Sequence, residues 1–160
     1  MIPTTPPNVQ TDTPPESSWE TWLQSPPGQY ILKSEQELFN QAVVDVFGYY
    51  ALQIGLPQIN TLAENRISLK LMLLPHGIAK ADGDLPYQPI EGIPEELPFA
   101  DQSIDLVVLP HVLEFAQDPH QILREVDRVL MPEGRVVISG FNPASLWGLR
   151  HYAGRLIGKN

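Results

Sequence analysis

The stretch that decides the fold runs from Leu97 to Gly140 and reads LPFADQSIDLVVLPHVLEFAQDPHQILREVDRVLMPEGRVVISG. Residues 104–109 form a short apolar run that ends at Pro110, as in a strand covered on both faces. Asp118-Pro119 is typical of a helix start, because aspartate accepts a hydrogen bond from the first turn and proline lacks only an N–H that would be unpaired there. Residues 135–140 are a second apolar strand. The stretch therefore predicts two parallel strands joined through a helix by a right-handed crossover.

Apolar residues recur at helical spacing between these two strands. They are Ile122, Leu123, Val126, Val129 and Leu130. Such a stripe is expected to pack on the sheet. The sequence Met131-Pro132-Glu133-Gly134 predicts the end of the helix, because Gly134 is free to adopt a left-handed conformation. One test decides the whole prediction: the segments centred on Val107 and Val137 must be parallel neighbours.

Length and composition limit what the rest of the chain can do. The 160 residues suffice for one α/β domain. A formal charge of -9 and a pI near 4.7 argue against a nucleic-acid backbone or an anionic membrane as the main partner, because both attract basic patches. No apolar run approaches the roughly 20 residues that span a bilayer, and the N-terminus lacks the features of a secretory signal. With no cysteines, the chain has no disulfides, and we expect a cytoplasmic protein with a small-molecule or protein partner.

The first 47 residues are expected to lie outside the sheet. Residues 1–16 are mostly proline, threonine and other polar residues, which predicts a disordered tail. Residues 17–47 predict an N-terminal helical segment. It comprises a short helix with Trp19 and Trp22, an interruption at Pro26-Pro27-Gly28, and an amphipathic helix that ends at residue 47. The α/β domain would then span residues 48–160.

The stretch 97–140 also resembles a known family. The residues that carry the resemblance are Leu97-Pro98-Phe99 with Asp101, Ser103 and Asp105, then Val112-Leu113-Glu114, Leu123-Arg124-Glu125, Arg128-Val129-Leu130 and Pro132-Glu133-Gly134. In this order they are similar to the second half of the class I S-adenosylmethionine-dependent methyltransferases, in particular the type-11 group. The resemblance implies an α/β fold, a three-layer Rossmann-like sandwich with a mainly parallel sheet. It also implies S-adenosylmethionine as cofactor and an N-terminal helix that either covers the sheet or lids the cofactor site.

The resemblance places the cofactor loop after a strand predicted from residue 49 to 54. The family has an acidic residue there and then three glycines at alternate positions, which let the backbone approach the ligand. This chain has Gln53 in the acidic place and keeps Gly55, whereas Pro57 and Ile59 replace the other glycines. A loop with proline and isoleucine at these positions does not suit a dinucleotide phosphate. Gln53 and Gly55 remain as predicted cofactor contacts.

Two further cofactor contacts are predicted at the ends of the next strands. A strand over residues 67–74 ends at Pro75-His76-Gly77, where the family usually has an acid that binds the ribose. His76 can donate one hydrogen bond instead, although a loop histidine is often only solvated. The family position that binds the adenine aligns with Ile93, with Glu95 and Glu96 as nearby substitutes.

The carboxyl end of the strand at residues 104–109 carries the remaining candidates, because ligands of open α/β sheets bind at that end. Pro110 and His111 stand there and are predicted to contact the cofactor, and Phe141 is expected to face the same rim. His111 is the candidate catalytic base for a nucleophile that carries a proton, since imidazole titrates near neutrality. The alternative is that His111 only orders the following turn. Glu114 is expected to be structural.

The sequence contains no competing chemistry. Its four histidines lack the paired spacing of a metal site, and no hydrolase, Walker or kinase motif is present. Two functions remain: a methyltransferase with an unidentified small-molecule substrate, or a non-catalytic module of the same fold that has lost the cofactor and binds a partner. The changes at Gln53, Pro57, Ile59 and Ile93 favour the second. Because the chain ends soon after residue 140, we expect a sheet that is incomplete at its C-terminal edge and open to a second copy of the chain.

Overall fold

The computed structural model describes residues 16–77 and 85–141, and its elements are three helices and five strands. The helices are α1 (Glu16–Leu23), α2 (Pro26–Val43) and α3 (Pro119–Val129). The strands are β1 (Tyr50–Ile54), β2 (Leu69–Leu74), β3 (Gln88–Glu91), β4 (Ile104–Pro110) and β5 (Leu130–Ser139). The predicted tail falls almost entirely on residues 1–15, which lie outside the described residues.

All five strands run in the same direction in one sheet with the order β3-β2-β1-β4-β5. Val107 of β4 lies opposite Val136, and Val108 lies opposite Val137. The segments centred on Val107 and Val137 are therefore parallel neighbours, as the sequence predicted. β1 pairs with both β2 and β4, which puts the loop after β1 at the middle of the sheet's carboxyl edge.

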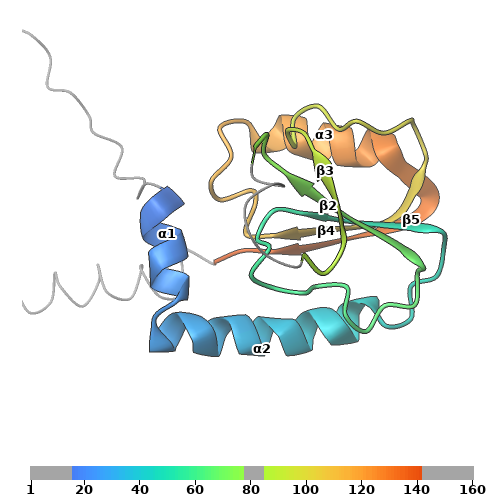
Figure 1. Cartoon of the computed structure of the whole chain (residues 1–160). Helices are drawn as coiled ribbons and strands as arrows, with labels where there is room; N and C mark the ends of the chain where they lie inside the picture. The colour runs from blue at the N-terminus through green and yellow to red at the C-terminus, as the bar shows by residue number, and fades with distance from the viewer. Residues whose placement is uncertain (1–15, 78–84, 142–160) are drawn as a thin grey trace, which may run out of the picture.

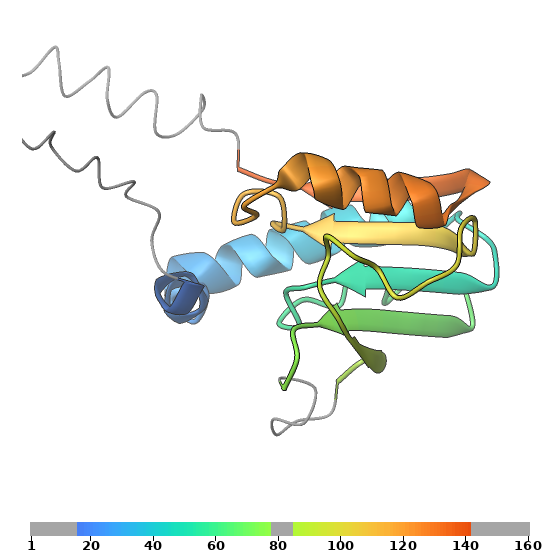
Figure 2. The ribbon, with the colours of Figure 1, turned by 90° about the horizontal axis from the view of Figure 1, so that it is seen from above.

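Helices cover both faces of the sheet and give the predicted three layers. Figure 1 shows α3 above the sheet and α2 below it. Ile122, Val126 and Val129 of α3 are buried with the side chains of β4 that face them, such as Val107 and Leu109. On the other face Phe39 and Val43 of α2 join a second buried cluster, to which Trp19 of α1 packs. Figure 2 shows the strand arrowheads pointing toward the side on which α1 lies.

The predicted end of the helix at residues 131–134 was wrong. The segment Met131-Pro132-Glu133-Gly134 does not close a helix, because α3 ends at Val129 and Leu130 is already extended, with ψ at 134°. Leu130 pairs with Ile104 across a register shift, so sheet pairing overrides the helical pattern of the sequence. Leu123 of the predicted stripe is correspondingly 36% exposed.

The predicted interruption at Pro26-Pro27-Gly28 was also wrong, because this motif begins α2. Ser25 is the N-cap of α2 and its hydroxyl accepts a hydrogen bond from the Gly28 amide at 3.4 Å, with proline in the first turn. A Cβ on Gly28 would lie 2.3 Å from the Trp22 carbonyl oxygen, so the glycine lets α1 and α2 meet in a tight corner. α2 accordingly starts earlier than predicted and ends at Val43.

Within the described residues the outer edge of β5 has no strand partner. Its side chains Met131, Val136 and Ile138 are exposed. None of the described helices is both long and apolar enough to cross a membrane.

Candidate functional site

A pocket of about 310 Å³ lies at the carboxyl edge of the sheet, where the loops of four strands converge. Its walls come from the loop after β1, the end of β2, the segment after β3 and the end of β4, and α1 adds Trp19 and Glu20. Of the predicted cofactor contacts, Gly55, Pro110 and His111 line it. The structure thus brings three of the six candidates together at the edge where open α/β sheets bind ligands.

The loop after β1 is held from inside by Gln53. This side chain is fully buried, and its amide nitrogen donates to the carbonyl oxygens of Gly55, Leu56 and Ile59, each at 3.0 Å. Its Oε1 accepts hydrogen bonds from the hydroxyl and the amide of Thr61, at 2.7 and 3.3 Å. With its polar atoms engaged inside the protein, Gln53 shapes the loop and does not line the pocket.

The conformation of this loop explains why Gly55 is retained. Gly55 has φ at 72° and the next residue, Leu56, has φ at 46°, so two successive residues are left-handed. A Cβ on Gly55 would stand 3.4 Å from Val112 across the pocket wall. Pro57 lines the pocket, whereas Ile59 points into the core and is 2% exposed. The two non-glycine residues therefore sit in different surroundings, and only Pro57 borders the ligand space.

His76 and Ile93 lie away from the pocket walls. The His76 side chain is 74% exposed, with Nδ1 3.6 Å from a Glu91 carboxylate oxygen. Ile93 is 47% exposed and forms an isolated bridge with Glu96. Pro94 and Glu95 reach the pocket from this side instead. Of these two, only Glu95 was considered from the sequence, as a nearby substitute for Ile93.

His111 is a buried side chain of the pocket that contacts two carboxylates. It is 3% exposed and has φ at 53° directly after β4. Its Nε2 lies 2.7 Å from Oε1 of Glu35, which belongs to α2, and its Nδ1 lies 2.8 Å from Oε1 of Glu114. Oε1 of Glu114 also accepts the Phe141 amide at 2.8 Å. His111 thus joins α2 to the loop that follows β4.

The two carboxylates govern the protonation of His111. Burial by itself lowers the pKa of a histidine, but the hydrogen bonds and charges of Glu35 and Glu114 outweigh it, so the pKa of His111 lies above its ordinary value of 6.5. Oε2 of Glu35 is buried and has no partner among the described residues. No sequence pattern pointed to Glu35, because this residue is 76 positions away from His111 and reaches it only through the fold.

Aromatic rings surround the outer side of His111. The ring centroids of Trp19 and Phe141 lie 5.5 and 4.6 Å from the imidazole, and Trp19 stacks on Trp22. Trp19 also contacts Phe115, which lines the pocket. Phe141 therefore faces the rim of His111 as predicted, while Asn142 and the residues after it lie outside the described part of the chain.

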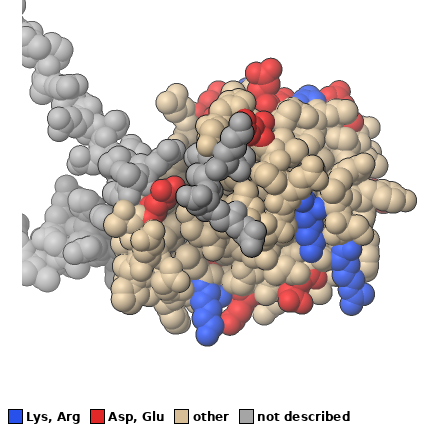
Figure 3. All heavy atoms as spheres, in the orientation of Figure 1, with Lys and Arg blue, Asp and Glu red and all other residues tan. Residues whose placement is uncertain are grey.

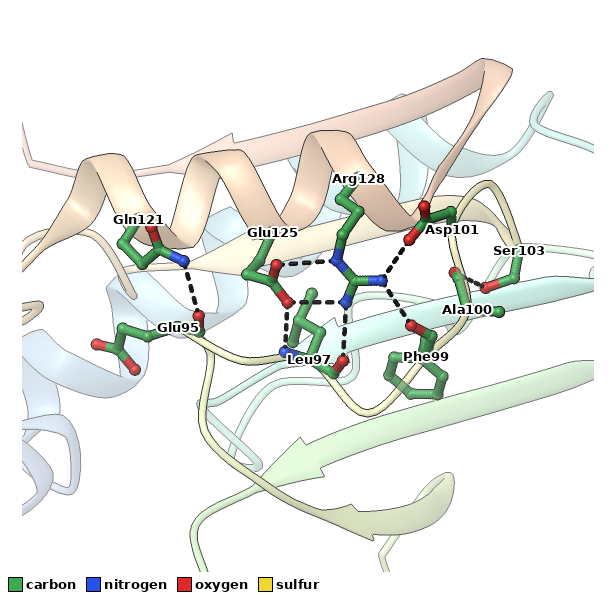
Figure 4. A network of polar contacts seen from close by, with 9 residues as sticks. All are labelled: Glu95, Leu97, Phe99, Ala100, Asp101, Ser103, Gln121, Glu125 and Arg128. Atoms are coloured by element: carbon green, nitrogen blue, oxygen red, sulfur yellow. Dashed lines mark hydrogen bonds and ion pairs between the residues drawn. The ribbon is translucent and has the colours of Figure 1, made fainter.

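A second polar network fixes the wall that carries Glu95, and Figure 4 shows it from close by. Arg128 and Glu125 of α3 form a two-bond ion pair, with nitrogen–oxygen distances of 2.8 and 2.9 Å. The same pair binds both backbone groups of Leu97: Glu125 accepts its N–H at 2.8 Å and Arg128 donates to its carbonyl at 3.0 Å. The pair thus imitates a neighbouring strand for the loop after β3.

This network extends along the same loop in both directions. Arg128 also donates to the Phe99 carbonyl and to Asp101, and Gln121 donates to the Glu95 carbonyl at 3.1 Å. The hydrogen bonds and charge of Arg128 lower the pKa of Glu125. The stretch from Leu97 to Gly140, which carries the family resemblance, therefore provides most of this network and, at the end of β4, one wall of the pocket.

Charges near the site are mostly negative. Glu20 and Glu95 line the pocket, and no lysine or arginine does so among the described residues. On the face drawn in Figure 3 the basic side chains stand apart and form no patch. No group of His, Asp or Glu among the described residues could hold a metal ion. The site therefore suits an uncharged or cationic ligand.

Comparison with known proteins agrees with this geometry. A family model described as a methyltransferase domain matches residues 67–138. The uncharacterized protein YafS of Escherichia coli is 37% identical over 131 residues, which are 82% of this chain and 52% of that protein. A malonyl-[acyl-carrier protein] O-methyltransferase of Halorhodospira halophila is 43% identical over 54 residues, 34% of this chain and 18% of that enzyme. The chain thus spans about half the length of YafS, and less of the other.

Solved structures share the fold. An S-adenosylmethionine-dependent methyltransferase from Archaeoglobus fulgidus superposes with a TM-score of 0.64 at 16% identity, over 89% of this chain and 66% of that one. A possible histamine N-methyltransferase from Thermotoga maritima gives a TM-score of 0.62 at 19% identity, with the same shares. At this level of identity the likeness concerns the fold alone.

Proposed function

Because this chain has the class I methyltransferase fold and matches the methyltransferase domain over residues 67–138, we propose that it binds S-adenosylmethionine and methylates a small molecule in the cytoplasm. The observation that carries the proposal is the pocket at the carboxyl edge, built from Gly55, Glu95, His111 and the loops around them. The comparisons do not favour the alternative, a non-catalytic module of the same fold.

The residues present fit the cofactor. The pocket volume of about 310 Å³ lies at the lower end of the range for small-molecule sites. Gly55 leaves the backbone of the β1 loop open to close approach, and the carboxylates of Glu20 and Glu95 are acceptors for hydroxyl and amino groups. When bound, the cofactor supplies a methyl group on a cationic sulfur, and the acidic lining complements that charge.

Methyl transfer asks the protein chiefly to hold two reactants in line and to exclude water. The rings of Trp19 and Phe115 do the second, since they close the pocket on the side of α1. The role of His111 as a base stays a prediction. Both of its ring nitrogens face carboxylates, so it can accept a substrate proton only after the ring has lost a proton and one of these contacts has opened.

Calorimetric titration of the folded protein with S-adenosylmethionine and S-adenosylhomocysteine tests the proposal. We expect saturable binding, weakened about tenfold by Gly55→Ala, because a methyl group there meets Val112 and borders the ligand. Gly77→Ala is the matched control: Gly77 is also left-handed, with φ at 86°, but has open space and lies outside the pocket walls. No heat at millimolar ligand would leave the non-catalytic module as the better reading.

A further inference from the structure

Glu35 is a charged residue that α2 brings to the pocket from a distant part of the chain. Its side chain is 16% exposed and meets His111, which is 3% exposed, at 2.7 Å. An ionised carboxylate buried to this degree requires a compensating partner, and His111 is the partner that the fold provides. The contact therefore has a purpose beyond the general packing of α2 on the sheet.

The geometry defines which atoms carry protons. Ionised carboxylates can only accept hydrogen bonds, and both nitrogens of His111 lie within 2.8 Å of one. Both nitrogens must then donate, so the ring is an imidazolium held between two negative groups. The charged groups that face it are Glu35 from α2 and Glu114 from the loop after β4, while Trp19 and Phe141 are uncharged. The cluster has a net negative charge and is sensitive to pH.

The same contact also bears on the position of α1, in addition to the packing of Leu23 and Trp19 against the core. α1 and α2 are joined by a tight corner at Gly28, and Gln29 of α2 donates to the carbonyl of Leu23 at 2.9 Å. Because these two helices are joined at this corner, a bond between α2 and the end of β4 also helps to hold Trp19 and Glu20 on the pocket wall. Glu35 is thus tied to the ligand space through His111 on one side and through α1 on the other.

We propose that Glu35 is a positioning residue of the pocket, which holds His111 from α2 and thereby keeps α1 closed over the bound cofactor. This rests on the function proposed above, since the ligand is S-adenosylmethionine or its product. The contact makes cofactor affinity depend on the charge of His111. We call the contact between Glu35 and His111 the latch. Below the pKa of His111 the ring is charged, the latch is intact and the ligand gains the contacts of α1. Above this pKa the neutral ring releases one carboxylate and the contacts of α1 with the ligand weaken.

Titration with S-adenosylhomocysteine across pH tests the proposal. We expect the dissociation constant of the unaltered protein to rise five- to tenfold as the pH increases through the raised pKa of His111. Glu35→Gln should weaken binding by a similar factor at low pH and shift the midpoint to lower pH, because one of the two charges that stabilise the imidazolium is gone. Glu37→Gln is the matched control, since Glu37 lies on the same helix and is exposed. Equal affinity and an equal midpoint in both variants would overturn the proposal.

A second measurement needs no ligand and separates the two proposals. Ring nitrogen NMR shifts of His111, assigned with His111→Asn, report its protonation directly, and asparagine tolerates the left-handed backbone at this position. In a Trp147→Phe background the remaining emission comes from Trp19 and Trp22, which both belong to α1, and it reports the position of this helix. If the unaltered protein binds no cofactor but Glu35→Gln still lowers the His111 pKa and alters this emission, the function falls and the latch remains. If neither changes, the latch is refuted whatever binds.

Discussion

The described part of the chain contains two networks of charged side chains, and they differ in what they bind and in how far apart their members lie in the sequence. The His111 cluster joins side chains of two segments, Glu35 from α2 and His111 and Glu114 from the loop after β4. The Arg128 network lies within one stretch, from Glu95 to Arg128, and its charged groups bind the backbone of the loop after β3. The loss of a single proton from His111 can release one contact of the His111 cluster, whereas the Arg128 network holds the backbone of the loop after β3.

The two networks also respond to opposite ends of the pH scale. His111 has a raised pKa, so its contribution to stability is complete below the unfolded value near 6.5 and is lost as the pH rises through the folded value. Glu125 has a lowered pKa, so its contribution is present above the ordinary value and is lost as the pH falls through the folded one. Arg128 stays charged throughout. Of these two networks, only the His111 cluster therefore changes its contribution to stability when the pH is varied near neutrality.

The largest expected effect comes from breaking the Arg128 network. Arg128→Met removes hydrogen bonds to two carbonyls and leaves Glu125, 13% exposed, without its cation. We expect the free energy of unfolding, measured with urea, to fall by about 3 kcal/mol. Arg124→Met on the same helix is the control. Among the described residues Arg124 bonds only to Gln121 and its side chain is exposed, so this change should cost less than about 0.5 kcal/mol. Similar losses in both variants would mean that the loss of a positive charge on α3, and not the loss of the Arg128 network, lowers the free energy of unfolding.

Gln53 tests whether binding to the backbone is costly to lose even without charge. Gln53→Leu leaves three carbonyls and both donors of Thr61 without this partner, and we expect a loss of about 2 kcal/mol in the same urea assay. Gln53→Glu restores the family's usual acid but places a carboxylate against three carbonyl oxygens, so it should be at least as destabilising. A stable Gln53→Glu protein would show that the loop can rearrange.

The sequence predicted what depends on neighbours along the chain. The parallel pairing of β4 and β5 and the burial of Ile122 and Val126 follow from local apolar patterns. The boundary of α3 was misjudged because the pairing of Leu130 with Ile104 is a contact across the sheet. Local patterns predict an element's type better than its ends, which tertiary contacts decide.

The candidate site was predicted in position but not in composition. Gly55, Pro110 and His111 were predicted at one edge, and they line one pocket because parallel strands bring their carboxyl ends together there. The partners of His111 were not, since Glu35 and Trp19 come from helices whose placement on the sheet no local pattern specifies. Gln53 was expected to contact a ligand, and nothing in its neighbours signalled that its amide closes the loop from behind.

The His111 cluster should cost less to weaken than either backbone network. Glu35→Gln keeps a hydrogen-bonding group beside Nε2 but removes one charge, so we expect a loss of about 1 kcal/mol at pH 6. The difference from the unaltered protein should shrink as the pH rises, because the imidazolium is lost in both. Urea unfolding at a series of pH values measures this. A difference that grows with pH would place the proton on a carboxylate and not on His111.

The smallest effect is expected at the surface pair of Arg135 and Asp45, which sets the baseline for the other charged groups. Their side chains are 51% and 68% exposed, with a nitrogen–oxygen distance of 3.1 Å, similar to the distances within the Arg128 network. Arg135→Gln should change the free energy of unfolding by less than about 0.5 kcal/mol, and added salt should remove even that difference. Distance is then not what separates the pairs: Arg128 is important because its partners are backbone groups that water cannot replace once the loop is packed. A loss at Arg135 comparable to that at Arg128 would contradict this distinction.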